Sequence, residues 1–163
     1  MNIEERLNEL GLVLPSAVRP PDNVKLPFAA VRIIGNIAFI SGHGPQNADG
    51  SISGPFGKVG DEVSVAEAYL AARCTALSIL GSLKRELGDL DRVTSWLRVF
   101  GMVNSAPDFE LHPAVINGFS DLILDLYGPI RGQHSRSAVG MAALPFRICV
   151  EIEAEVEIEI DSL

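Results

Sequence analysis

The segment 148–160 is the feature of the sequence that most constrains the fold, because apolar and acidic residues alternate along it. Successive side chains of a β-strand point to opposite faces, so one face of this strand is apolar and the other acidic. The apolar face carries Ile148, Val150, Ile152, Ala154, Val156, Ile158 and Ile160, and the opposite face carries Cys149, Glu151, Glu153, Glu155, Glu157 and Glu159. The pattern predicts a sheet with one face in the core and the other against water, a ligand or a partner subunit.

Caps and turn residues define the other elements. Ser64 and Glu67 form a capping box that opens a long amphipathic helix, and Pro113 opens a second helix reaching Tyr127. A short helix is expected at 3–10, and the remaining strands are expected at 31–34, 37–41, 93–103 and 137–142. The core order is therefore β-β-α-β-α-β-β, which predicts an α+β fold with two helices packed on one face of a mixed sheet.

Length and charge limit the classes of function. A chain of 163 residues suits one domain, with 1–27 as an N-terminal extension and 28–160 as the core. The net charge of −8, without a cluster of basic residues, argues against a nucleic-acid partner. Neither a signal peptide nor a membrane-spanning run is recognisable, so no membrane association is expected and the predicted compartment is the cytoplasm.

The sequence offers little for a metal or cofactor. The histidines at 43, 112 and 134 are far apart and lack the spacing of metal ligands, and no glycine-rich phosphate loop is present. Cys74 and Cys149 form no CxxC pair and are expected to be reduced packing residues. We therefore expect no metal and no cofactor.

The predicted sheet has one face that two helices leave uncovered. Its strands carry more apolar residues than two helices can bury, so this face is expected to pack against copies of the same chain. Clefts between such copies are common places for small-molecule sites.

Arg136 and Glu151 are the candidates for chemistry. The arginine opens one strand and can bind a carboxylate through its planar, permanently charged fork. Glu151, on the acidic face of the next strand, can orient a water or transfer a proton. The two are expected to lie within reach of one another at a sheet edge. Two interpretations remain open: a substrate clamp, or a structural ion pair between Arg136 and a strand glutamate.

Two motifs resemble a known family. The stretch from Arg136 to Ala154, with its Ala-Leu-Pro corner and Val-Glu-Ile-Glu-Ala strand, resembles the signature of the YjgF/YER057c/UK114 family, also called the reactive intermediate deaminase (Rid) family. The segment 35–45, Gly-Asn-Ile-Ala-Phe-Ile-Ser-Gly-His-Gly-Pro, is similar to the early strand motif of that family. The resemblance covers roughly residues 28–158 and identifies the chain as a longer branch of the family.

This resemblance implies a chorismate-mutase-like fold, a homotrimer with sites in the subunit clefts, and metal-independent hydrolysis of reactive enamines or imines to keto acids and ammonia. It implies that Arg136 binds a substrate carboxylate and that Glu151 handles the attacking water. Asn117, Ser41 and Gly42 would line the same cleft.

The chain departs from the family pattern within the expected site. Phe28 stands where the best-known deaminases have tyrosine, His43 replaces the usual glutamine, and Ala138 replaces a frequent cysteine. His43 is either a proton donor or a packing residue. The leading hypothesis is a deaminase of a carboxylate-bearing imine or enamine, and the alternatives are an endoribonuclease, a name that the family often carries, or a non-catalytic metabolite-binding protein.

Overall fold

The computed structural model describes residues 1–160, and the predicted single domain extends beyond them to residue 163. The order of elements agrees with the sequence analysis. In chain order they are α1 (Ile3–Glu9), β1 (Val31–Ile34), β2 (Ile37–His43), α2 (Val65–Leu87), β3 (Val93–Asn104), α3 (His112–Arg131), β4 (Ser135–Met141) and β5 (Val150–Ile158).

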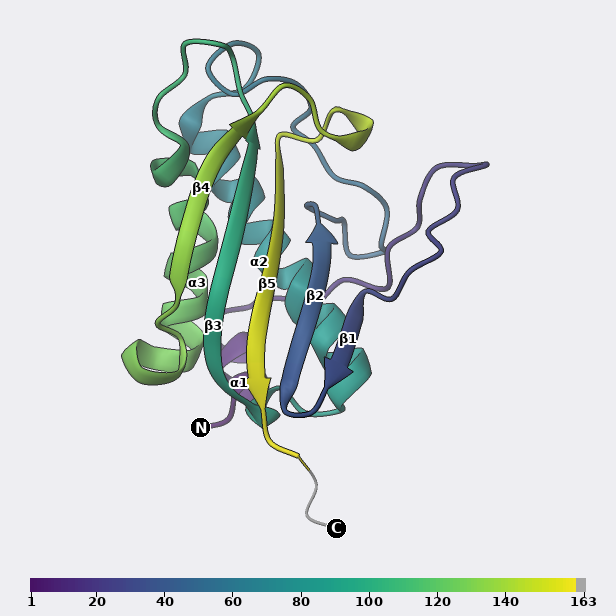
Figure 1. Cartoon of the computed structure of the whole chain (residues 1–163), viewed down its shortest axis with the longest axis vertical. Coiled ribbons are helices and arrows are strands. Elements are labelled where there is room, and N and C mark those ends of the chain that lie inside the picture. Colours follow the sequence, from purple (N-terminus) through teal and green to yellow (C-terminus); the bar gives the residue numbers. More distant parts are fainter. Residues whose placement is uncertain (161–163) are drawn as a thin grey trace.

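The five strands form one mixed sheet in the order β1-β2-β5-β3-β4. All neighbours are antiparallel except β3 and β4, which run parallel. Figure 1 shows α2 and α3 behind the sheet and the front of the sheet uncovered. We call this uncovered side, which carries Phe39, Phe100, Met102, Glu153 and Glu155, the open face. The predicted α+β architecture, with two helices on one face of a mixed sheet, is confirmed.

The alternating pattern of the last strand sets the position of the core. Val150, Ile152 and Val156 are fully buried against the helices, whereas Glu153 on the open face is exposed. Cys149 departs from the prediction, because it is fully buried instead of sharing the acidic face. Cys149 precedes β5, and its carbonyl accepts a hydrogen bond from the Asn104 amide. The strict alternation of buried and acidic residues therefore begins at Val150, the first residue of β5.

The two long helices begin close to the predicted residues. Ser64 caps α2 through the expected capping box with Glu67, and Gly88 ends the helix in a left-handed conformation. In α3 the predicted stop at Gly128 is also left-handed, but Pro129 starts a further turn that runs to Arg131. Among residues 1–160, no helix combines the length and apolar character needed to span a lipid bilayer.

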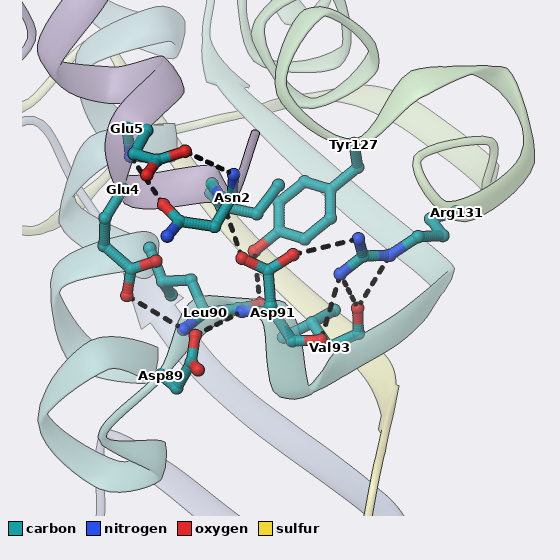
Figure 2. Close-up of polar contacts among 10 residues, drawn as sticks. Asn2, Glu4, Glu5, Asp89, Leu90, Asp91, Val93, Tyr127 and Arg131 are labelled. Atoms are coloured by element: carbon teal, nitrogen blue, oxygen red, sulfur yellow. Dashed lines mark hydrogen bonds and ion pairs between the residues drawn. The ribbon is translucent and has the colours of Figure 1, made fainter.

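The N-terminal helix docks on the ends of the two long helices. Asp91 accepts hydrogen bonds from the Ile3 amide at 2.8 Å and from Arg131 Nη1 at 3.1 Å, as Figure 2 shows. Glu4 accepts a hydrogen bond from the Leu90 amide at 3.1 Å. Beyond α1 the chain passes behind the helices and loops out beside β1 before it enters the sheet (Figure 1).

Candidate functional site

Glu151 lies at the wall of a pocket of about 290 Å³ at one end of the sheet. Phe28, Ser41, Gly42 and His43 line the same pocket. At Gly42 a Cβ atom would come within 2.7 Å of Glu151 Oε2, so a side chain at this position would displace the carboxylate from its place beside β2. The fold therefore brings together five of the seven residues that the sequence analysis placed in the site.

The Glu151 carboxylate has an environment suited to proton transfer. Burial raises its pKa, and the negative charge of Glu153 raises it further. Within the described residues, no hydrogen bond or ion pair occupies its oxygens. A carboxyl group whose pKa is raised in this way holds a proton more readily, so it can act first as an acid and, once deprotonated, as a base.

His43 is part of a hydrogen-bond chain inside the protomer. Nδ1 lies 2.6 Å from the Ser41 carbonyl oxygen and therefore carries the proton, and Nε2 accepts from Ser82 Oγ at 2.8 Å. Ser82 in turn accepts a hydrogen bond from Arg85 Nη2 at 3.0 Å. Because both ring nitrogens are occupied by these partners, the proton-donor interpretation of His43 does not fit, and the packing interpretation does.

The buried position of His43 predicts how the stability of the protein depends on pH. Burial lowers the pKa of His43 below its ordinary value of 6.5, and the charge of Arg85 lowers it further. The unfolded chain then binds a proton that the folded chain does not, so this residue costs stability as the pH falls below about 6.5. His43→Gln is expected to shrink the loss of unfolding free energy between pH 7 and pH 5.5 by about 1 kcal/mol, as measured by urea titration. An unchanged loss would show that another group titrates there.

Arg136 lies on the other face of the sheet, at the edge strand β4. Its Nη1 donates to Asn117 Oδ1 at 2.9 Å and to Ser120 Oγ at 3.0 Å, and its Nη2 donates to the Pro113 carbonyl at 3.3 Å. A guanidinium has five N–H groups, so Nε–H and one Nη2–H remain for a ligand. The predicted site residue Asn117 thus supports Arg136 from α3.

Arg136 and Glu151 do not meet within one protomer. In the register of the sheet, Val99 of β3 is the partner of Arg136 on β4 and of Ala154 on β5. Ala154 faces the helices, and cross-strand partners point to the same face, so Arg136 also lies on the helix side. Side chains alternate between the two faces along a strand, and Glu151 is three residues from Ala154 on β5. Glu151 therefore points to the open face. The expectation that the two groups lie within reach of one another is therefore wrong within a single chain. The ion-pair interpretation is wrong as well, because the described partners of Arg136 are uncharged.

Ser120 and His134 are site residues that the sequence analysis missed. Ser120 Oγ lies 2.9 Å from His134 Nε2, and His134 Nδ1 lies 2.7 Å from the Gly132 carbonyl oxygen. The serine accepts from Arg136 and donates to the histidine, which fixes where the guanidinium points. The spacing of Asn117 and Ser120, three residues apart on one helix face, was the available signal.

A second group of charges lies far from this pocket. Oxygens of Glu4, Asp89 and Asp91 come close enough to one another to hold a metal ion. Lys84, Arg131 and backbone amides already donate to these oxygens. The group therefore serves to dock α1 (Figure 2).

Comparison with known proteins agrees with this architecture. The sequence model of the family described as "YjgF/chorismate_mutase-like, putative endoribonuclease" matches residues 4–155. Protein TCP17 of Trypanosoma cruzi is 38% identical over 156 residues, covering 96% of this chain and 94% of that protein.

Solved structures give the same result. The crystal structure of Atu1372 from Agrobacterium tumefaciens has a TM-score of 0.85 and 41% identity, covering 97% of this chain and 92% of that one. A Shewanella oneidensis protein named "putative endoribonuclease" has a TM-score of 0.86 and 28% identity, covering 97% of this chain and 100% of that one. The chain belongs to the YjgF/chorismate-mutase-like family.

Proposed function

We propose that the protein hydrolyses a carboxylate-bearing imine or enamine to a keto acid and ammonia, at a site shared by two copies of the chain. The observation that carries this proposal is the Glu151 carboxyl, which faces a pocket and has no hydrogen-bond or ion-pair partner among residues 1–160. Arg136 supports it, since two of its N–H groups remain available at the edge of the sheet. The Glu151 carboxyl suits proton transfer, and the Arg136 guanidinium suits the binding of a substrate carboxylate.

The proposed reaction needs only positioning and proton transfer. Water attacks the imine carbon, a C–O bond forms, and the π electrons of C=N move to nitrogen, which takes a proton from the neutral Glu151 carboxyl. The attacking water, now bonded to carbon, passes one of its two protons to the amine nitrogen. The remaining hydroxyl proton then goes to the Glu151 carboxylate as the C=O bond forms, the C–N bond breaks and NH3 leaves, which restores the neutral Glu151 carboxyl. Holding the substrate carboxylate and the water in place contributes several kcal/mol.

A second copy of the chain would complete the site. Arg136 faces the helix side at the β4 edge, whereas the pocket of Glu151 lies at β2 and β5. The open face also carries exposed apolar side chains, including Phe39 and Val139, which need a cover. We propose a closed homotrimer, the assembly that the family resemblance implies, in which Arg136 of one copy approaches the pocket of the next.

Ser120→Ala tests how Arg136 is positioned. The substitution removes the hydroxyl between Arg136 and His134, so the guanidinium loses one of its holding hydrogen bonds. KM is expected to rise about tenfold or more with little change in kcat, since a hydrogen bond from a charged group contributes about 1.5–3 kcal/mol. Steady-state kinetics of the variant check this. A fall in kcat at unchanged KM would contradict a purely positioning role, and Ser120→Thr should retain the native KM.

The deaminase assay tests the proposal directly. 2-Aminoacrylate is generated in place from serine by a dehydratase, and keto-acid formation is followed with and without the protein. Acceleration is expected. Binding of keto acids without acceleration by a correctly assembled protein would favour the non-catalytic binding alternative.

The family description also names an endoribonuclease, which is the second candidate. The net charge of −8 weakens binding to a phosphate backbone. Incubation with RNA in nuclease-free conditions is expected to show no cleavage that depends on Arg136. RNA cleavage lost in Arg136→Ala would support this candidate instead.

A further inference from the structure

We infer that the Glu151 pocket selects substrates with a large apolar side chain, at least as large as that of leucine. This inference rests on the proposed function, because it names the substrate class for the same site. Its basis is the composition of the pocket wall and the volume of about 290 Å³.

The pocket wall is apolar on three sides, which come from separate parts of the chain. The N-terminal segment, the loop after β2 and the connection before β5 contribute one side each, through Val18, Leu26, Phe28, Ile52, Phe146 and Ile148. Several of these side chains are partly exposed to solvent, for example Leu26 at 39% and Phe146 at 42%. Exposed apolar side chains gathered around one cavity gain stability when an apolar group covers them.

Most polar groups of the side chains in the same wall already have partners within the protomer. Ser41 Oγ donates to the Ala29 carbonyl at 2.7 Å, and both nitrogens of His43 are bonded within the protomer. The Gln46 amide donates to the carbonyls of Ser16 and Gly50. Among residues 1–160, a ligand thus meets two available polar side-chain groups, the Glu151 carboxyl and the Gln46 carbonyl oxygen, in a wall that is otherwise mainly hydrocarbon.

The volume indicates the size of the group. The cavity has room for about ten water molecules. A three-carbon substrate such as 2-aminoacrylate would reach Glu151 and leave most of this space to water against apolar walls. A branched or thioether side chain of four or more heavy atoms would occupy more of it, and an acidic side chain would meet the carboxylate of Glu151 while Arg136 of the next copy is already bound to the substrate's own carboxylate.

The N-terminal segment contributes two of the apolar side chains on which this selectivity depends. Val18 and Leu26 lie in the extension before residue 28, and both line the pocket. The extension therefore shapes the site, and substitutions in it should change which substrate is preferred.

The test compares imines that differ only in their side chain. D-amino-acid oxidase converts D-leucine, D-methionine and D-alanine to 2-imino acids, whose reacting carbon is planar and has lost its configuration. Semicarbazide traps the imine, and hydrolysis by the protein reduces trapping. The kcat/KM for the leucine- and methionine-derived imines is expected to exceed that for the alanine-derived imine by about tenfold or more, the discrimination that hydrophobic pockets achieve per methylene. Equal values, or a preference for the small imine, would overturn the inference.

Variants of the extension locate the effect. In the double variant Val18→Ser/Leu26→Ser the ratio of leucine to alanine imine hydrolysis is expected to fall about tenfold. Val24→Ser is the matched control, because Val24 is a similarly exposed residue of the same segment, at 37%, and does not line the pocket. An unchanged ratio in the double variant, or an equal fall in Val24→Ser, would refute the assignment of the wall.

Binding separates this inference from the proposed function. If no imine is hydrolysed faster, the proposed function fails, and calorimetry then compares 4-methyl-2-oxopentanoate, pyruvate and 2-oxoglutarate. Tighter binding of the branched keto acid, weakened in the double variant, supports the pocket assignment alone. Equal binding of all three, or binding of none, refutes it.

Discussion

Replacing Arg136 with alanine is expected to lower kcat/KM for imine hydrolysis by about 10²–10³-fold, while the protein still folds and assembles. The guanidinium is the cation proposed to hold the substrate carboxylate, and truncating one partner of a desolvated charged pair costs about 2–5 kcal/mol. Keto-acid release from the variant, with thermal unfolding and size measured in parallel, checks this.

Two further variants sharpen this result. Arg136→Lys keeps the charge but loses the planar fork, so it is expected to recover only part of the activity. Arg6→Ala is the control, because Arg6 forms a surface ion pair with Asp125 at 2.9 Å and such pairs contribute little. Native activity in Arg136→Ala would remove the arginine from the mechanism.

The substitution Gly118→Ala is expected to cause a large loss of stability. At this position α3 lies so close to α2 that an added Cβ would overlap the Tyr69 carbonyl group. Because a backbone group cannot rotate away as a side chain can, the two helices must separate. We expect the free energy of unfolding to fall by about 3 kcal/mol and Tm by about 6–12 °C, measured at fixed protomer concentration.

Gly128→Ala is the matched control for this effect. Gly128 lies in the same helix with φ +73, and its added Cβ would meet nothing within 4 Å. With φ 73 and ψ 177 its backbone lies in a region that is essentially limited to glycine, so backbone strain alone should cost about 1–3 kcal/mol there. A loss in Gly118→Ala no larger than in Gly128→Ala would contradict close packing of the two helices.

The local elements could be predicted because their signals are local. The capping box at Ser64 and Glu67 depends on residues three apart, and the alternation of β5 depends on neighbours in the chain. The same is true of Ser41 and Gly42, which end β2 and therefore lie at the rim of the sheet. These patterns specified the elements, the buried face of the sheet and one half of the site.

The other half depends on which strands are neighbours. β4 and β5 are consecutive in the chain, yet β3 lies between them, because β4 pairs in parallel with β3. This long-range pairing, together with the parity of the register, puts Arg136 and Glu151 on opposite faces. No local pattern contains that information, and consecutive strands are neighbours in only about two-thirds of cases. The partners of His43, Ser82 and Arg85, are likewise distant in sequence.

Subunit complementation tests the central claim most directly. Arg136→Ala and Glu151→Gln are each expected to be inactive, and co-assembled mixtures of the two should regain activity. If each site takes Arg136 from one copy and Glu151 from another, random mixing of equal amounts restores about a quarter of native activity. Mass spectrometry of the intact assembly confirms that the subunits have mixed. No recovery in mixed assemblies would contradict a site shared between copies.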